Sequence, residues 1–259
     1  MSRILGSDVG ATVLAQDIYE ISATQKHRLG TKLVRGDRVF KYGKAMNAFA
    51  DTQHLAYSYY HQHIMYALIQ AAAVAGDSAI AVTVAATDGA DNDGAFLVDA
   101  LEGGYVVIFD ASSGEWLNYA INNSTVVAAG GGTITITLDG ELPIALTTSD
   151  HVEVMSSPYT VIVSNGGGTR GFMGLPMRLA TLASPYHWLQ TWGPCWVSPN
   201  GRVGAAQYKN ACVARNDGSI DIVSGESAMT ADGQPVGFVL TYSQAGGQGA
   251  PFIMLQISH

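Results

Sequence analysis

The pattern of apolar and polar positions is irregular at the start of the chain. Over the first 45 residues the apolar positions follow neither the twofold period of a strand nor the 3.6-residue period of a helix. Only RGDRVFKYG has strand character there. We therefore expect residues 1–45 to form an extended N-terminal arm with one or two short strands. Residues 46–75 form a connecting segment after this arm. They are ambiguous, because their alanines favour a helix whereas YSYYHQHIMY favours a strand.

From residue 76 onward the pattern is that of short β-strands. SAIAVTVAAT places Ile80, Val82 and Val84 on one face, and GTITITL alternates isoleucine with threonine. YVVIF has the composition of a fully buried strand, and HVEVM and YTVIVS come after it. Turn clusters such as DGADNDG, EGG and SNGGG separate these runs. After residue 180, WLQTW, an NDGS turn, GFVLTYS and FIMLQIS form a second group.

These patterns predict the fold class. We expect a mainly β protein in which the extended arm precedes two small antiparallel units of sandwich or barrel type. The expected domain boundaries are 76–180 for the first β domain and 181–259 for a C-terminal β domain packed on it.

Composition and charge narrow the choice of partner. Charged residues make up 13% of the chain, about half the usual ~25%, which favours a surface partly covered by another protein. The net charge of −8 opposes non-specific binding of nucleic acid, because such binding needs a basic patch. Residues 26–44, KHRLGTKLVRGDRVFKYGK, are nevertheless locally basic. This asymmetry indicates a docking segment within the arm.

The sequence also indicates the cellular compartment in which the protein is made. MSRILGSDVG lacks the apolar core of a secretory leader, and no run of about 18 apolar residues is present. We expect no membrane association and synthesis in the cytoplasm. The two cysteines, Cys195 and Cys212, are too few for a disulfide framework. Two reduced thiols are the expectation, with a Cys195–Cys212 disulfide as the alternative.

The stretch YHWLQTWGPCWV looks catalytic, because it resembles the surroundings of a papain-type or thioredoxin cysteine. A papain-type nucleophile begins a helix, but Pro199 and Gly201 come too soon after Cys195 for one to form. The only later histidine is His259, and a thioredoxin motif would need a second cysteine. Cys195 is therefore not expected to be a nucleophile. The Tyr and Trp side chains of the stretch are expected to fill a core or domain seam, with an intersubunit contact or a sugar-stacking platform as alternatives.

The other candidate sites, for metals and phosphate, lack the residues or the spacing that their chemistry needs. His61 and His63, with His54 nearby, lack neighbouring acidic ligands, and DGADNDG does not match a calcium-loop pattern. The GGG runs lack the Lys and the helix of a phosphate loop. We expect no metal, no cofactor and no catalytic residues, and hence a protein that is not an enzyme.

Two blocks resemble the capsid decoration (cement) proteins of tailed bacteriophages. They are HRLGTKLVRGDRVFKYGKA and YHWLQTWGPCWV, the latter with a GFVL strand further along the chain. The β segments GDSAIAVTV, EGGYVVIF and YTVIVS are similar to the middle of such proteins.

The resemblance implies a virion structural protein on the capsid exterior. Such a protein bridges major capsid protein subunits, commonly as a homotrimer, and its N-terminal arm does part of the clamping. It has neither an active site nor a nucleic-acid partner. Carried onto this chain, the resemblance gives as partner-contact candidates Arg28, Leu29, Gly30, Thr31, Arg35, Asp37, Arg38, Phe40 and Tyr42. If the arm does this clamping, deletion of residues 1–44 leaves a folded body that no longer binds capsids.

Two other functions remain open from the sequence. One is a β protein of the phage tail or fibre base. The other is a carbohydrate-binding module, in which case substitution of Trp188 or Trp192 by alanine would abolish glycan binding without unfolding the chain.

Overall fold

The structure is a computed structural model that describes residues 15–59, 65–89, 91–164, 171–199, 203, 210–222, 233–241 and 252–259. All regular elements in these ranges are β-strands, and no helix occurs among them. The chain forms two compact units, unit 1 from residues 1–59 and 159–259 and unit 2 from residues 60–158. The mainly β fold with two antiparallel units is thus confirmed.

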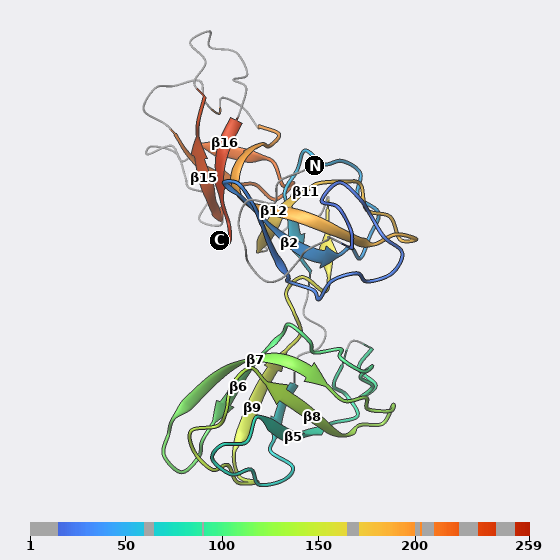
Figure 1. Ribbon diagram of the computed structural model, residues 1–259, viewed down its shortest axis with the longest axis vertical. Coiled ribbons are helices and arrows are strands. Elements are labelled where there is room, and N and C mark those ends of the chain that lie inside the picture. The colour runs from blue at the N-terminus through green and yellow to red at the C-terminus, as the bar shows by residue number, and fades with distance from the viewer. Residues whose placement is uncertain are drawn as a thin grey trace. The chain divides into compact units, whose positions relative to one another are not determined.

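Unit 1 is built on one antiparallel sheet of ten strands (Figure 1). Its main path runs β10-β3-β11-β12-β16-β15-β13-β14, and β2 pairs with both β1 and β12. The strands are β1 (Lys32–Arg35), β2 (Arg38–Lys44), β3 (Ala56–Ser58), β10 (Ile162–Val163), β11 (Phe172–Pro176), β12 (Tyr186–Trp196), β13 (Ala211–Ala214), β14 (Ile220–Ile222), β15 (Pro235–Val239) and β16 (Phe252–Gln256).

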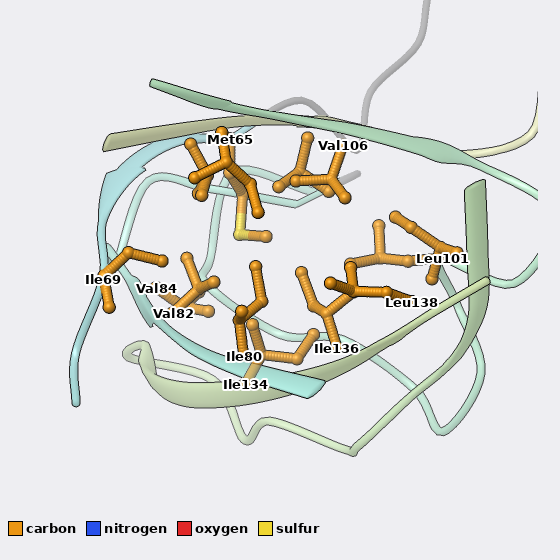
Figure 2. Close-up of a cluster of buried hydrophobic side chains, with 14 of the residues drawn as sticks. Met65, Ile69, Ile80, Val82, Val84, Leu101, Val106, Ile134, Ile136 and Leu138 are labelled. Atoms are coloured by element: carbon orange, nitrogen blue, oxygen red, sulfur yellow. The ribbon is translucent and has the colours of Figure 1, made fainter. Parts of the chain in front are cut away.

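Unit 2 is a six-stranded antiparallel sheet in the order β4-β9-β6-β7-β8-β5. Its strands are β4 (Met65–Leu68), β5 (Ala79–Val84), β6 (Tyr105–Phe109), β7 (Trp116–Ser124), β8 (Gly132–Leu138) and β9 (His151–Met155). A bridge between Ile69 and Val82 brings the two edge strands together, so the sheet curls into a nearly closed barrel. The interior is filled by aliphatic side chains, which point toward one another in Figure 2.

The alternating patterns of the sequence account for this interior. Ile80, Val82 and Val84 of β5 are buried, as predicted, and so are the isoleucines of β8. YVVIF differs from the prediction of a fully buried strand, because only Val106 and Ile108 point inward while Tyr105 is exposed. The reason is that one face of β6 packs on the barrel core and the other is free of it.

Unit 2 is inserted between two neighbouring strands of unit 1. β3 leads into the insertion and β10 comes directly after it, and Ser58 of β3 pairs with Ile162 of β10. The backbone N–H of Tyr59 donates to the Val161 carbonyl at 2.9 Å. The chain therefore leaves and re-enters unit 1 side by side, the usual geometry of a tolerated domain insertion.

The compact units divide the chain differently from the expected boundaries at 76 and 180. Strand β12 begins after residue 180, but its partner β2 precedes residue 45, and such long-range pairing leaves no local signal in the sequence. Within the ambiguous stretch 46–75 the described residues contain the strands β3 and β4 and no helix; residues 60–64 lie outside the described ranges.

The described residues 15–45 do not form the extended arm that the sequence predicted. Residues 38–44 form β2, which pairs with β12 from Val39 to Lys44. Phe40 and Tyr42 are fully buried in a cluster with Ile18 and Trp188. Five of the basic residues that suggested an arm are exposed or half-exposed positions of the paired strands β1 and β2, and Lys26 and Arg28 precede them. Residues 1–14 lie outside the described ranges.

Candidate interaction surfaces

The partner-contact candidates lie on and before the hairpin of β1 and β2. Phe40 and Tyr42 are buried in the unit's own core and are closed to a partner. Asp37, in the turn of the hairpin, is exposed. The other six are half-buried; they are Arg28, Leu29, Gly30, Thr31, Arg35 and Arg38. The hairpin brings the nine candidates into one region but leaves only part of them accessible.

The two arginines of the hairpin have partners within the chain. Arg35 donates to Asp17 at 3.0 Å. Arg38 donates to the side-chain oxygen of Gln190 at 2.7 Å, and its guanidinium lies over the Phe40 ring, 4.8 Å from the centroid. Arg38 therefore helps to attach the hairpin to β12.

Lys32 and Lys41 form a like-charged cross-strand pair. They are directly opposite each other in the register of β1 and β2. No carboxylate of the described residues pairs with either ammonium group. Burial, and to a smaller extent the charge of Lys32, lower the pKa of Lys41. Like charges placed directly opposite in a sheet are destabilising, so this pair costs unit 1 stability.

The aromatic stretch on β12 supports the hairpin from within. Trp188 is 1% exposed, and its ring lies edge-on to Tyr42 with centroids 5.0 Å apart. Its indole N–H donates to the Gln16 carbonyl, while the Tyr42 hydroxyl donates to the Gln16 side-chain oxygen at 2.6 Å. The predicted core packing is confirmed for Trp188, whereas Trp196 is exposed. A sugar cannot stack on a buried ring, so a glycan platform at Trp188 is wrong.

Cys195 lies within strand β12 and is buried. Burial raises the pKa of its thiol to about 12, although the positive charge of Arg38 acts in the opposite direction. The reactive thiolate is therefore scarcely populated near neutral pH. Cys195 and Cys212 are both free thiols in the structure, in agreement with the expectation of two reduced cysteines.

The candidate metal ligands have other roles where they are described. His54 Nδ1 lies 2.8 Å from Asp51 Oδ2, and His61 and His63 lie outside the described ranges. In the DGADNDG turn, Asp88 and Asp93 accept backbone N–H groups of Ala85 and Ala95. No group of three or more metal-ligating side chains occurs in the described part of the chain. Nor do these ranges contain a helix of the length and apolarity needed to cross a bilayer.

Unit 2 carries an exposed aromatic face that the sequence pattern did not reveal. It is the outward side of β4, β9, β6 and β7, and its aromatic and aliphatic members are Tyr66, Leu68, Tyr105, Phe109, Trp116 and His151. One row crosses all four strands, from Leu68 through His151 and Phe109 to Trp116. At about 4.8 Å per strand, that row is about 14 Å long. Hereafter these six residues are called the aromatic face.

The rings of the aromatic face contact one another but stay open to solvent. Tyr66 stacks on His151 with centroids 5.3 Å apart, and Phe109 meets Trp116 edge-on at 5.6 Å. Trp116 is 71% exposed, Tyr66 67% and Tyr105 51%. Glu153 lies in the next row, opposite both Tyr66 and Val107, and is exposed. The signal that would have revealed this face is the alternation of Tyr105, Val107 and Phe109 along β6.

The two units differ in their charged side chains. Residues 60–158 contain 12 Asp and Glu and no Lys or Arg, so all 13 basic side chains belong to unit 1. Several aspartates of unit 2 accept turn N–H groups, such as Asp77 from Val74 and Asp150 from Thr147. These hydrogen bonds satisfy the carboxylates but leave their charge uncompensated within the unit.

Comparison with known proteins identifies no similar protein. No protein-family model matches the chain, no curated protein matches it, and no solved structure matches it.

Proposed function

We propose that this chain is a virion structural protein that decorates the exterior of a tailed-phage capsid and bridges major capsid protein subunits. The capsid as partner rests on the resemblance of the two sequence blocks to cement proteins. A bridging role is supported by one structural observation. The chain has two units with separate cores, and their exposed surfaces differ in chemistry.

A bridging protein needs at least two surfaces that engage different sites. Unit 1 offers the basic hairpin of β1 and β2, with the exposed turn at Asp37. Unit 2 offers the aromatic face, and exposed contiguous apolar surface of this kind marks interaction sites. Binding only to the assembled shell stabilises the shell by mass action, and many copies add up through effective concentration.

Co-sedimentation with purified expanded heads of the phage that encodes the chain tests this proposal. The full chain is expected to sediment with heads and to stay in solution without them. Substitution of Arg35 and Asp37 by alanine alters the exposed end of the hairpin and is expected to weaken binding. Lys44→Ala, an exposed position at the far end of β2, is the matched control. A full chain that never sediments with heads would refute the proposal.

A further inference from the structure

The hairpin and the aromatic face are chemically complementary. The Lys32–Lys41 pair lacks a described carboxylate partner. A carboxylate brought in by another molecule would relieve the repulsion between the two ammonium groups. The hairpin therefore favours an acidic partner.

The aromatic face favours the opposite charge. Glu153 lies in the row beside it, Glu115 directly precedes Trp116, and unit 2 contains no Lys or Arg. Exposed Tyr and Trp rings bind ammonium and guanidinium groups through cation–π contacts, and Glu153 adds a carboxylate beside them. A cationic surface fits this face, whereas an anionic one is repelled.

Two identical aromatic faces are a poor match for each other. Face-to-face pairing would bring together two units that each carry 12 carboxylates and no Lys or Arg. Such a like-charged interface is unfavourable. An interface between unlike surfaces of two copies avoids this repulsion, and head-to-tail interfaces of that type form closed rings when the rotation between copies closes and open filaments when it does not.

We propose that the β1–β2 hairpin of one copy of this chain binds the aromatic face of unit 2 of a second copy. Lys32 and Lys41 then lie against Glu153 and the exposed rings of Tyr66 and Trp116. The inference deepens the proposed function and rests on it. The Lys32–Lys41 pair and the aromatic face join neighbouring copies, the exposed hairpin turn at Asp37 is left for the capsid, and the oligomer as a whole bridges the capsid subunits.

The mass of the full chain in solution, measured by light scattering without heads, tests the interface. We expect an oligomer at low ionic strength that dissociates as NaCl is added, because salt screens the charge contacts. A mass of one chain at every protein and salt concentration would overturn the proposal. If that monomer still sedimented with heads, the proposed function would stand without this interface.

Substitution on unit 2 separates a specific contact from a net-charge effect. Glu153→Lys is expected to raise the dissociation constant about tenfold, because a charge contact becomes a repulsion. Glu141→Lys makes the same change of net charge at an exposed turn outside the face and should leave association unchanged. Equal effects of the two variants would contradict a specific role for the face.

Substitution on the hairpin gives a second, independent readout. Lys32→Glu places a carboxylate opposite Lys41 within the same chain, so it should raise Tm while weakening association about tenfold. Lys44→Glu is the control with the same charge change. A Lys32→Glu chain that associates like the wild type would overturn the proposal.

A glycan array with the full chain tests whether a saccharide, and not a second copy of the chain, binds the aromatic face. We expect no saccharide to bind at the aromatic face. Saccharide binding that Trp116→Ala abolishes, with association unchanged, would assign the face to a glycan and refute the proposal.

Discussion

At the residue scale, unit 1 depends on a small group of side chains that join distant parts of the sequence. Trp188 on β12 meets Tyr42 on β2, and both reach Gln16 through hydrogen bonds. His27 lies against both rings, with centroids 5.1 Å from Tyr42 and 5.2 Å from Trp188. This packing holds the hairpin on the sheet, so Trp188 and Tyr42 are core residues and do not form a binding platform.

Trp188→Ala is expected to destabilise unit 1 by about 3–5 kcal/mol, the usual cost of truncating a fully buried Trp. Urea unfolding monitored by circular dichroism measures the loss. Trp196→Ala, on the same strand but exposed, should cost clearly less. Equal losses for the two variants would contradict the assignment of Trp188 to the core.

His187 makes the stability of unit 1 depend on pH. Its ring is buried beside Phe49, and Nδ1 donates to the Pro185 carbonyl at 2.9 Å, while Nε2 has no hydrogen-bond partner among the described residues. Burial lowers the pKa of His187 to about 4. In the unfolded chain the pKa is about 6.5, so the unfolded state binds the proton first as pH falls.

The contribution of His187 to stability is therefore complete above pH about 6.5 and is lost as pH falls toward about 4, by roughly 3 kcal/mol in total. Urea unfolding at a series of pH values measures this loss. His187→Asn keeps a donor near Pro185 and should flatten the pH dependence over that range. An unchanged slope in the variant would show that other groups cause it.

At the element scale, β2 is an internal strand of the sheet, one strand away from the edge strand β1. It pairs with β1 on one side and with β12 on the other, and Phe40 and Tyr42 fill the core beneath it. A strand in this position cannot be removed without exposing the core and the unpaired backbone of β12. The basic residues that suggested an arm lie on the exposed or half-exposed positions of β1, β2 and the residues before them.

Deletion of residues 1–44 is therefore expected to unfold unit 1, and not to leave a folded body as the sequence suggested. Unit 2 should keep its own transition, because it lies wholly within residues 60–158. Thermal unfolding monitored by circular dichroism distinguishes the two outcomes. A deletion variant with both transitions intact would contradict the role of β2 as an internal strand that covers the core of unit 1.

The sequence predicted local features well and long-range ones poorly. Alternation identified β5 and β8 correctly, because each buries one face and period 2 is visible in the residues themselves. The pairing of β2 with β12 joins residues about 150 positions apart, and no local pattern encodes it. The aromatic face was missed because YVVIF was interpreted as buried on both sides.

At the scale of the whole molecule, the two units differ in how their charge is balanced. Unit 1 holds every Lys and Arg, and unit 2 accumulates carboxylates whose charges no basic side chain offsets within the unit. Self-repulsion of this kind destabilises a compact state and is weakened by salt. The insertion of unit 2 between two paired strands makes it separable.

Residues 60–158 expressed alone are expected to fold cooperatively, with a Tm that rises as NaCl is added. Differential scanning calorimetry at low and high salt measures both properties. The full chain provides the comparison, because the Tm of its unit 1 transition should rise less with NaCl than the Tm of unit 2. A fragment that stays unfolded at high salt would contradict its independence.

Electron cryo-microscopy of tailed-phage heads prepared with and without the chain tests the proposed capsid role most directly. We predict additional density on the outer surface of the shell, with each copy touching at least two capsid subunits. A shell whose exterior is unchanged by the chain, or density confined to the tail, would contradict the account.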